Sequence, residues 1–332
     1  MKVKNILVTG GAGFIASNFL FILLKNTSIN AVVNLDKMTY AGKEENMAGL
    51  NDDERYSFVK GDICDKLLVR DLLEKFNFDT IVHFAAESHV DNSIDGPEVF
   101  IQTNIMGSFI LLDCAKRYWN NNFEDKLFIH VSTDEVYGHL DNSDPAFTEE
   151  TPYDPSSPYS ASKASSDHIV LSYFKTFKMP VIVTNCSNNY GPRQDDEKLI
   201  PTVIRTALKG DAIPIYGKGE NIRDWLFVDD HCLGILDVIS KGRLGEKYNI
   251  GGNNEWANID LVKKICEILD KEAPKSSGNY SDQITFVTDR LGHDKRYAIN
   301  PTKMNQEIGW EHSYTFNEAL LSTIKFYINK YN

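Results

Sequence analysis

The chain has 332 residues, of which 42% are hydrophobic and 25% charged, a balance typical of a globular protein with one large core or two smaller ones. Its formal net charge is −12 at pH 7. Because no broad basic field offsets these carboxylates, the composition disfavours binding to nucleic acid or to an anionic membrane, although a local group of cations can still bind an anionic substrate.

The sequence also limits where the protein works. No apolar run is long enough to span a bilayer. A strand is expected almost from the N-terminus, which leaves no room for a secretory signal peptide. Five widely spaced cysteines without a CxxC pair favour reduced thiols in a cytoplasmic protein: Cys64, Cys114, Cys186, Cys232 and Cys266.

The first segment has the pattern of a dinucleotide-binding turn. An apolar strand is predicted over 5–9, then the turn Gly10-Gly11-Ala12-Gly13, then a helix over about 14–25. Glycines allow backbone N–H groups to approach a pyrophosphate, and a helix N-terminus favours its charge. The spacing Gly10-x-x-Gly13-x-x-Ala16 departs from strict GxGxxG but still permits close packing of helix on strand.

An acidic residue ends the second predicted strand, which covers 31–35. Asp36 stands where a carboxylate accepts hydrogen bonds from an adenosine ribose, and it would repel a 2′-phosphate. The position therefore favours NAD over NADP. The neighbouring Lys37 weakens this preference without reversing it, and the alternative for Asp36 is a simple turn acid.

Strands and helices alternate through the rest of the first half. Strands are predicted over 56–59, 79–84, 126–131 and 180–184, and helices over 65–76, 97–119 and 159–178. This alternation predicts an α/β fold with a Rossmann-type doubly wound parallel sheet. We expect residues 1–187 to form the NAD-binding domain.

After residue 187 the chain changes to short elements and polar loops. Helices are expected from 198, over 229–240 and over 316–331, extended pieces over 213–217 and 226–228, and loops over 248–252 and 289–294. We expect a smaller C-terminal α/β substrate domain over most of 188–332, with a return to the large sheet near 226–250. Loop cations at Lys198, Arg223 and Arg290 indicate an anion site, because guanidinium groups suit a diphosphate.

The polar stretch Ser132-Thr133-Asp134-Glu135 follows the buried strand predicted over 126–131. In open α/β sheets ligands bind at such strand ends. Tyr159 and Lys163 lie four residues apart in a predicted helix and therefore share one face. A hydroxyl, two carboxylates, a phenol and an ammonium indicate acid–base chemistry at a bound dinucleotide. The alternative is that the two acids are solvated residues of a loop turn.

The glycine turn, Asp36 and the pair Tyr159-x-x-x-Lys163 together resemble the extended short-chain dehydrogenase/reductase family, over essentially the whole chain. Within it the chain is similar to the dTDP-glucose 4,6-dehydratases, from which it departs only at Ala16, usually Gly, and Leu291, often Pro. The segments that carry this similarity are 132–138, Asp36-Lys-Met-Thr-Tyr-Ala-Gly42, Ala85-Ala-Glu-Ser-His-Val-Asp91, Asn185-Cys-Ser-Asn-Asn-Tyr-Gly-Pro192, Lys198-Leu-Ile-Pro201, Ile222-Arg-Asp-Trp225 and Gly292-His-Asp294.

The resemblance implies a Rossmann domain that holds NAD, a nucleotide sugar across the cleft, and a homodimer built on two long helices per subunit. It implies no metal, and the spacing from His83 to His89 fits no common zinc pattern. The implied NAD-binding residues are Gly10, Gly13, Phe14, Ile15, Asp36, Lys37, Met38, Thr39, Asp62, Ile63, Ala85, Ala86, Ser88, Tyr159, Lys163 and Asn189. The implied substrate-binding residues are Ser88, Thr133, Asn188, Lys198, Leu199, Pro214, Tyr216, Arg223, Asn258, Arg290 and His293.

The resemblance also implies a reaction, the loss of water from a nucleotide-linked glucose in deoxysugar biosynthesis. Tyr159 removes the proton of the C4 hydroxyl, Lys163 lowers the pKa of Tyr159 and holds the nicotinamide ribose, and Thr133 hydrogen-bonds the C4 oxygen. Glu135 is the base for the C5 proton, and Asp134 is the acid for the departing C6 hydroxyl. The two carboxylates need opposite protonation states, and the sequence alone does not say which is which.

Two other classes of function remain open at this point. One is a related sugar-nucleotide enzyme, such as a 4-epimerase, a decarboxylase or a dehydratase for another nucleotide; the acid pair counts against an epimerase. The other is a non-catalytic dinucleotide sensor, which the presence of Tyr159, Lys163 and both acids disfavours. First principles do not fix the nucleobase.

Overall fold

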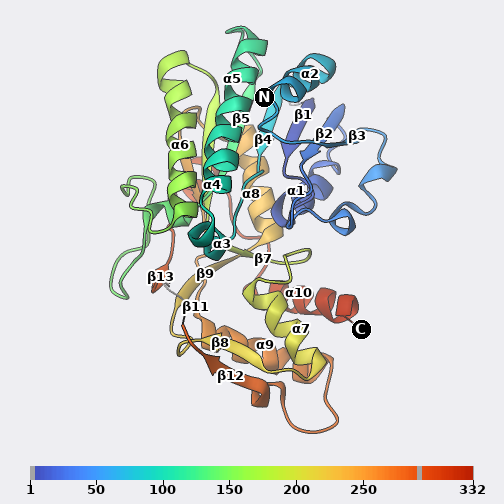
Figure 1. The fold of residues 1–332 in the computed structure, drawn as a ribbon, viewed down its shortest axis with the longest axis vertical. Coiled ribbons are helices and arrows are strands. Elements are labelled where there is room, and N and C mark those ends of the chain that lie inside the picture. Colours follow the sequence, from blue (N-terminus) through green and yellow to red (C-terminus); the bar gives the residue numbers. More distant parts are fainter. Residues whose placement is uncertain (1–3, 290–293, 332) are drawn as a thin grey trace.

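The computed structural model describes residues 4–289 and 294–331. Seven parallel strands form its large sheet, in the order β10-β6-β5-β4-β1-β2-β3 (Figure 1). Their bounds are β1 Asn5–Thr9, β2 Ala31–Asp36, β3 Tyr56–Lys60, β4 Thr80–His83, β5 Leu127–Thr133, β6 Val181–Cys186 and β10 Lys247–Ile250. The prediction of a doubly wound parallel sheet is confirmed.

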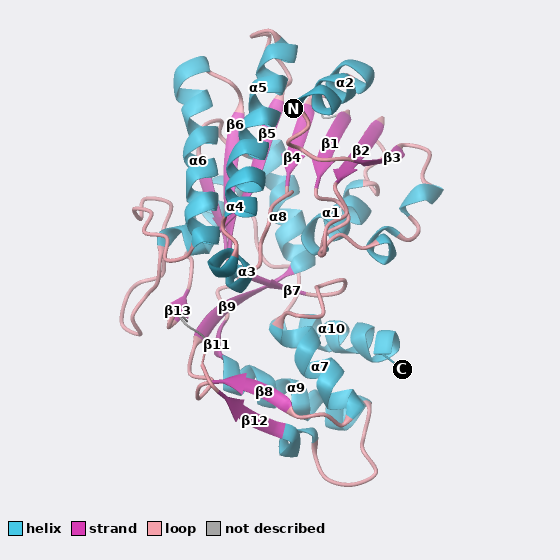
Figure 2. Cartoon of the chain, viewed as in Figure 1, coloured by secondary structure: helices cyan, strands magenta, loops and turns pink. Residues whose placement is uncertain are grey.

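Helices cover both faces of this sheet (Figure 2). On one face α2 (Lys66–Phe76), α5 (Ser108–Trp119) and α6 (Pro158–Phe177) share an apolar core, and on the other α1 (Phe14–Leu23) packs against α8 (Val228–Lys241). In β1 the side chains alternate between the two cores, Leu7 entering the first and Ile6 and Val8 the second. A strand buried on both sides is apolar throughout, which explains why the sequence pattern is so clear here.

The strand order reverses between β1 and β4, and this is the switch point at which open α/β sheets bind ligands. The carboxyl ends of β1, β2, β4, β5 and β6 meet there and face the smaller unit of the chain (Figure 1). The fold therefore places the polar strand ends predicted from sequence along one edge.

The helix predicted over 97–119 is continuous but not uniform. After α3 (Val90–Asp95) it runs through α4 (Glu98–Phe100), a π-helical segment at Ile101–Gly107 and then α5. Within the π segment, the side chain of Asn104 accepts a hydrogen bond from the backbone N of Glu87 at 2.8 Å and donates to the hydroxyl of Ser162 at 2.8 Å. The wider turn thus connects the end of β4 to α6, in keeping with the occurrence of such turns at functional sites.

The smaller unit lies beyond the carboxyl edge of the large sheet (Figure 1). Four strands form one sheet and two form another, and three helices pack together beside them. These elements are β7 Asn188–Tyr190, β9 Ile222–Phe227, β11 Glu255–Ala257 and β13 Arg296–Tyr297; β8 Ile213–Tyr216 and β12 Ile284–Val287; and α7 Leu199–Lys209, α9 Asn258–Glu272 and α10 Phe316–Tyr331. Short helical turns at Glu44–Met47, Leu50–Asp52, Tyr280–Gln283 and Met304–Ile308 complete the described chain.

Two expectations for the second half are wrong. Residues 223–225, expected to precede a strand, lie inside β9, and residues 248–250 of the loop expected over 248–252 belong to β10. This strand pairs with β6 at the edge of the large sheet and is the return of the chain that was expected near 226–250. Both strands bury polar side chains that are hydrogen-bonded: Asp224 Oδ1 accepts from the backbone N of Asn254 at 2.7 Å, and Asn249 Nδ2 donates to the carbonyl of Phe147 at 3.2 Å. Because partners far along the chain satisfy these groups, the local pattern looks like a loop.

Within the two described ranges, none of the helices is long and apolar enough to cross a membrane.

Candidate active site

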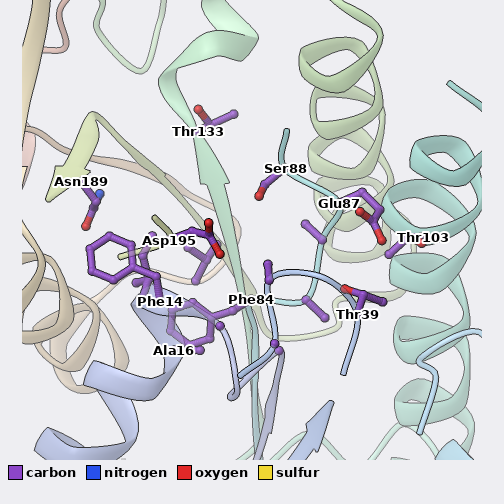
Figure 3. Close-up of a pocket in the computed structure, with 18 of the residues that line it drawn as sticks. Phe14, Ala16, Thr39, Phe84, Glu87, Ser88, Thr103, Thr133, Asn189 and Asp195 are labelled. Atoms are coloured by element: carbon purple, nitrogen blue, oxygen red, sulfur yellow. The ribbon is translucent and has the colours of Figure 1, made fainter. Parts of the chain in front are cut away.

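One cleft collects the carboxyl ends of the large sheet. Figure 3 shows residues of this cleft from both units, Phe14, Ser88 and Thr133 from the large unit and Asn189 and Asp195 from the smaller one. The predicted site residues that line it are Gly10, Gly13, Phe14, Ile15, Asp36, Lys37, Thr39, Asp62, Ile63, Ala85, Ala86, Ser88, Thr133, Asp134, Glu135, Tyr159, Lys163, Asn188, Asn189 and Lys198. The structure therefore brings together all five residues predicted to be catalytic.

The glycine turn fits a dinucleotide. Gly10 has a φ of +76°, and a Cβ added there would lie 2.7 Å from the backbone N of Ala85. Only glycine therefore lets the end of β1 pass so close to the end of β4. Gly13 is the N-cap of α1, so the first N–H groups of that helix have no intrahelical partners, and its first residues line the cleft, a setting that suits a pyrophosphate.

Asp36 both shapes the turn and lines the cleft. Its Oδ2 accepts a hydrogen bond from the backbone N of Ala12 at 2.9 Å, and its Oδ1 accepts from the backbone N of Met38 at 2.7 Å. Since a carboxylate has about four acceptor positions, it can accept further hydrogen bonds from a ribose. The donor set and the glycine cradle together fit NAD. Met38, in contrast, does not line the cleft as expected; its φ of +59° belongs to the loop that Asp36 holds.

Lys37 and Asp62 form an ion pair of 2.8 Å at the ends of neighbouring strands. The hydrogen bond to Asp62 raises the pKa of Lys37, which stays positively charged at neutral pH. The cation is thus already partly neutralised by a carboxylate, which reduces its ability to attract a 2′-phosphate.

The end of β5 differs slightly from expectation. Ser132 and Thr133 were expected to follow the strand, but they are its last two residues. Residues 134–137 then form a short 3-10 turn. Thr133 Oγ1 accepts a hydrogen bond from the backbone N of Glu135 at 3.3 Å and lies 3.3 Å from Asp134 Oδ1. This small cap holds the two carboxylic acids together at the edge of the sheet.

Asp134 is almost fully buried, with 2% of its surface exposed. Burial, and then the neighbouring charges of Glu135 and Asp224, raises the pKa of Asp134 well above its usual value. Its Oδ2 has no hydrogen-bond partner within the described residues. A buried, protonated carboxyl group with an unused oxygen in a cleft is suited to give a proton to a ligand.

Tyr159 and Lys163 enter the cleft from the start of α6. Ser157 caps this helix, with a reciprocal bond to Ser160 and proline at the first position, so the sequence fixes where the helix begins. Lys163 Nζ donates a hydrogen bond to the carbonyl of Val131 at 2.9 Å, and burial lowers the pKa of Lys163. In this structure burial also raises the pKa of Tyr159 well above 10, against the expectation that Lys163 would lower it.

Some of the predicted substrate residues stand apart from the cleft. Leu199, Pro214, Tyr216, Arg223 and Asn258 do not line it, and Arg290 and His293 lie outside the described residues. In the smaller unit β8 and β9 are joined by a turn that packs on the start of α9, where the backbone N of Asn258 donates to the carbonyl of Asn221 at 3.0 Å.

Arg223 is connected to the cleft through β9. Two positions further along that strand, Trp225 stands opposite Asn188 of β7, which does line the cleft. The guanidinium group of Arg223 lies 4.5 Å from the ring centre of Tyr297 and donates to the carbonyl of Asp294 at 3.0 Å. Strand β9 thus connects β7, which lines the cleft, with Arg223, which does not line it.

The cleft also contains residues that the sequence analysis did not select. Glu87 and Thr103 line it, as do Arg193, Gln194, Asp195 and Glu197 of the smaller unit. Two contacts join the units at its rim: the ion pair of Lys43 with Asp195 at 3.0 Å, and the ring of His89, whose Nε2 lies 3.4 Å from a carboxylate oxygen of Glu197. The position of Glu87 shortly after β4 is a sequence signal from which its place in the cleft could have been predicted. No sequence pattern links the two residues of either rim contact.

No group of three His, Cys, Asp or Glu side chains in residues 4–289 and 294–331 is arranged to hold a metal ion.

Known proteins with similar sequences and structures share this architecture. The family model described as GDP-mannose 4,6 dehydratase matches residues 7–323. A dTDP-glucose 4,6-dehydratase of Shigella flexneri is 51% identical over 340 residues, which cover 99% of this chain and 94% of that protein. The solved structure of dTDP-glucose 4,6-dehydratase from Bacillus anthracis, in complex with NAD, has a TM-score of 0.87 and 46% identity, and covers 98% of this chain and 97% of that one. The enzyme of the same name from Streptomyces venezuelae, with NAD and a second ligand bound, has a TM-score of 0.90 and 42% identity, with the same coverage of 98% and 97%.

Proposed function

The chain belongs to the GDP-mannose 4,6 dehydratase family, and we propose that it dehydrates dTDP-glucose to dTDP-4-keto-6-deoxyglucose with NAD as cofactor. The reaction oxidises C4, eliminates water across C5 and C6, and reduces C6, so that it leaves no net redox change. Its product suits deoxysugar biosynthesis, and the enzyme is a hydro-lyase.

One observation carries this proposal. Asp134 and Glu135 lie in the same cleft as Tyr159 and Lys163. Oxidation or epimerisation at C4 needs the phenol alone, whereas elimination also needs an acid and a base. Because burial holds the pKa of Asp134 well above its usual value, Asp134 keeps the proton that the leaving C6 hydroxyl requires.

We assign each residue a role from its place in the cleft. Tyr159 accepts the C4 hydroxyl proton, and Thr133 at the end of β5 hydrogen-bonds the C4 oxygen. Glu135 takes the C5 proton, which is acidic once C4 is a ketone. Lys163, anchored on Val131, keeps a positive charge near the phenol, where it favours the phenolate over the buried neutral form.

Bound NAD would supply hydride chemistry, accepting a hydride from C4 and giving it back to C6. The residues that would hold it are those around the switch point: Gly10 and Gly13 at the pyrophosphate, Asp36 at the adenosine ribose and Lys163 at the nicotinamide ribose. Ala85 and Ala86, small residues at the end of β4, leave space for the cofactor to pass close to the backbone.

We propose that the smaller unit binds the nucleotide part of the substrate. Asn188 and Lys198 at the cleft, with Arg223 behind them, are suited to a diphosphate, and the buried Oδ1 atom of half-buried Asn188 has no hydrogen-bond partner within the described residues. Pro214 and Tyr216 on β8 are proposed to contact the base. With these assignments residues 1–187 serve the cofactor and most of 188–332 the substrate.

The test is the mass of the product formed from a panel of nucleotide-linked glucoses. We expect loss of one water from dTDP-glucose, without consumption of added NAD. A product of unchanged mass would indicate an epimerase and overturn the proposal, and dehydration of a different nucleotide-glucose would overturn the choice of dTDP. Bound NAD with no turnover of any sugar in the panel would indicate a non-catalytic protein.

We also propose a homodimer in the cytoplasm. Large apolar side chains are exposed along the stretch from α3 to α5, at Ile94, Val99, Ile101, Met106 and Phe109, and such a face is typical of a subunit interface. Apart from Ile94, it lies on the first of the two long helices that the resemblance assigns to the dimer, the one over 97–119. All five cysteines are free thiols, which is compatible with a reducing compartment.

A further inference from the structure

Behind the catalytic groups lies a buried carboxylate to which the reaction assigns no role. Asp167 follows Lys163 by one turn of α6, and neither side chain is exposed beyond 3%. Tyr159, Lys163 and Asp167 recur at intervals of four residues and so share the helix face that meets the sheet. Burying a charged group without function is costly, so its contacts should show what it does.

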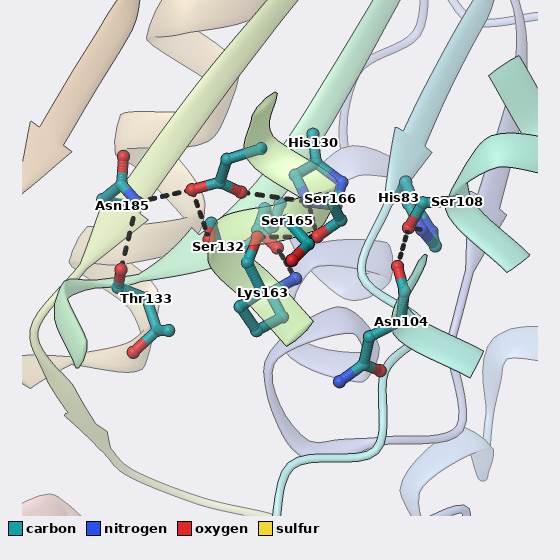
Figure 4. Close-up of polar contacts among 12 residues, drawn as sticks. His83, Asn104, Ser108, His130, Ser132, Thr133, Lys163, Ser165, Ser166 and Asn185 are labelled. Atoms are coloured by element: carbon teal, nitrogen blue, oxygen red, sulfur yellow. Dashed lines mark hydrogen bonds and ion pairs between the residues drawn. The ribbon is translucent and has the colours of Figure 1, made fainter. Parts of the chain in front are cut away.

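Asp167 is hydrogen-bonded to three other segments. Its Oδ2 accepts from the hydroxyl of Ser132 at 3.0 Å, from the hydroxyl of Tyr153 at 2.9 Å and from the amide of Asn185 at 3.3 Å. The same amide donates to the carbonyl of Thr133 at 3.0 Å. Figure 4 shows Ser132, Thr133 and Asn185 gathered around this network, with Lys163 beside them. One carboxylate thus joins the ends of β5 and β6, the loop before α6, and α6 itself.

His130 completes the network from β5. Its Nε2 lies 3.2 Å from Asp167 Oδ1 and 3.1 Å from the hydroxyl of Ser166, whose own proton goes to the carbonyl of Lys163 at 2.8 Å. Burial lowers the pKa of His130 to about 4, so the ring is neutral. With hydrogen on Nε2 the neutral ring donates to the hydroxyl of Ser166 and faces Asp167 Oδ1 without a charge, which leaves Lys163 and Lys247 as the cations near Asp167.

The charge of Asp167 acts on Lys163. Burial by itself raises the pKa of Asp167, but hydrogen bonds from His130 and Ser132 and the charge of Lys163 outweigh it, and the pKa is lowered. In return, Asp167 opposes the loss of charge that burial imposes on Lys163. From the other elements packed against it, Asp167 faces His130 of β5, Tyr153 of the loop and Lys247 of β10.

On the basis of the function proposed above, we propose that Asp167 is a positioning residue. Its carboxylate fixes the strand end that carries Thr133, Asp134 and Glu135 against the helix that carries Tyr159 and Lys163, and it keeps Lys163 protonated. The acid–base pair and the hydride-transfer pair come from different elements, and Asp167, carried by α6, is hydrogen-bonded to the end of β5 through Ser132 and to the end of β6 through Asn185.

The test compares Asp167→Asn with Asp230→Asn in the NAD-loaded enzyme. Asp230 is equally buried and accepts a hydrogen bond from the backbone N of Ser313 at 2.7 Å, but it does not line the cleft. We expect kcat of the Asp167 variant to fall about 10- to 100-fold at unchanged KM. Because Lys163 loses its balancing charge, the alkaline limb of kcat should move to lower pH. Asp230→Asn should retain both the kcat and the pH profile of the wild type.

A wild-type kcat and pH profile in Asp167→Asn, or the same loss in both variants without a shift of the alkaline limb, would overturn the proposal. If Asp167→Asn does not fold, Tyr153→Phe and Tyr248→Phe replace the pair, because each partly buried hydroxyl donates to a carboxylate, Tyr153 to Asp167 at 2.9 Å and Tyr248 to Glu307 at 3.0 Å. Only Tyr153→Phe should lower kcat. A wild-type kcat in Tyr153→Phe would also overturn the proposal. The wild-type enzyme in the same assay tests the proposed substrate separately, and if another nucleotide sugar is turned over the comparison is made on that sugar.

Discussion

The ammonium nitrogen of Lys163 lies 2.9 Å from the carbonyl oxygen of Val131, two residues before Thr133. The cation at the start of α6 is therefore attached to the strand whose end carries the hydroxyl and the two acids. This contact explains how two elements separated by a loop, which covers residues 138–157, act as one site. The position of the strand end therefore also depends on the side chain of Lys163.

The first prediction concerns Lys163→Met, which removes that hydrogen bond and the charge. Oxidation at C4 should slow by about 10²- to 10⁴-fold, because the buried Tyr159 then has no cation to stabilise its phenolate. The measurement is the appearance of reduced nicotinamide after mixing with dTDP-glucose in a single turnover. Near-wild-type oxidation would show that Tyr159 ionises without Lys163.

The second prediction separates the chemical steps. Glu135→Gln should still oxidise C4 but should not remove the C5 proton, so reduced nicotinamide should accumulate and the dehydrated product should be lost. Absorbance of the cofactor and mass spectrometry of the sugar report the two steps independently. Formation of the full product by Glu135→Gln would refute the assignment of Glu135 as the base.

The third prediction concerns Asp134 and pH. Because burial and the charges of Glu135 and Asp224 raise its pKa in the folded state, ionisation of Asp134 opposes folding, and its contribution to stability is lost as pH rises through that pKa. Asp134→Asn keeps a neutral group at every pH. It should stop dehydration yet raise the free energy of unfolding at neutral pH by about 1 kcal/mol. Chemical denaturation measures this, and a less stable variant would contradict a protonated Asp134.

The fourth prediction uses two glycines with the same backbone conformation. Gly10 and Gly210 have φ values of +76° and +78°, but a Cβ at Gly10 would meet Ala85 whereas nothing lies within 4 Å of one at Gly210. Each alanine variant should lose about 1 kcal/mol from the left-handed conformation. Only Gly10→Ala should lose more than that and retain less bound NAD, measured by thermal unfolding and by cofactor released on denaturation. Equal losses would mean that the approach of β1 to β4 is not tight.

The fifth prediction concerns the proposed dimer. Ile101→Glu places a charge in the exposed apolar stretch of the long helix and should yield a monomer in sedimentation or light scattering. Leu67→Glu, at a residue 70% exposed on α2, is the matched control and should leave the oligomeric state unchanged. A dimer that persists in Ile101→Glu would place the interface elsewhere.

Much of the fold could be predicted because its signals are local. The strand over 5–9 has the predicted bounds, as does the helix over 316–331, and the strand ending at Asp36 was visible as a short pattern. The predicted resemblance to dTDP-glucose 4,6-dehydratases is confirmed by relatives that match nearly the whole chain. The polar stretch at 132–135 was likewise apparent, since only its own residues are needed to recognise it.

The sequence by itself determined which groups the protein carries: the glycine turn, Asp36, the acid pair and the phenol–ammonium pair four residues apart. Only the tertiary structure decided that burial raises the pKa of Asp134, that the strand expected to return to the large sheet is β10 at its edge, that Arg223 stands outside the cleft lining, and that Asp167 accepts a hydrogen bond from the end of β5. The reason is physical: a pKa depends on burial and on neighbouring charges, and these come from residues far apart in the chain.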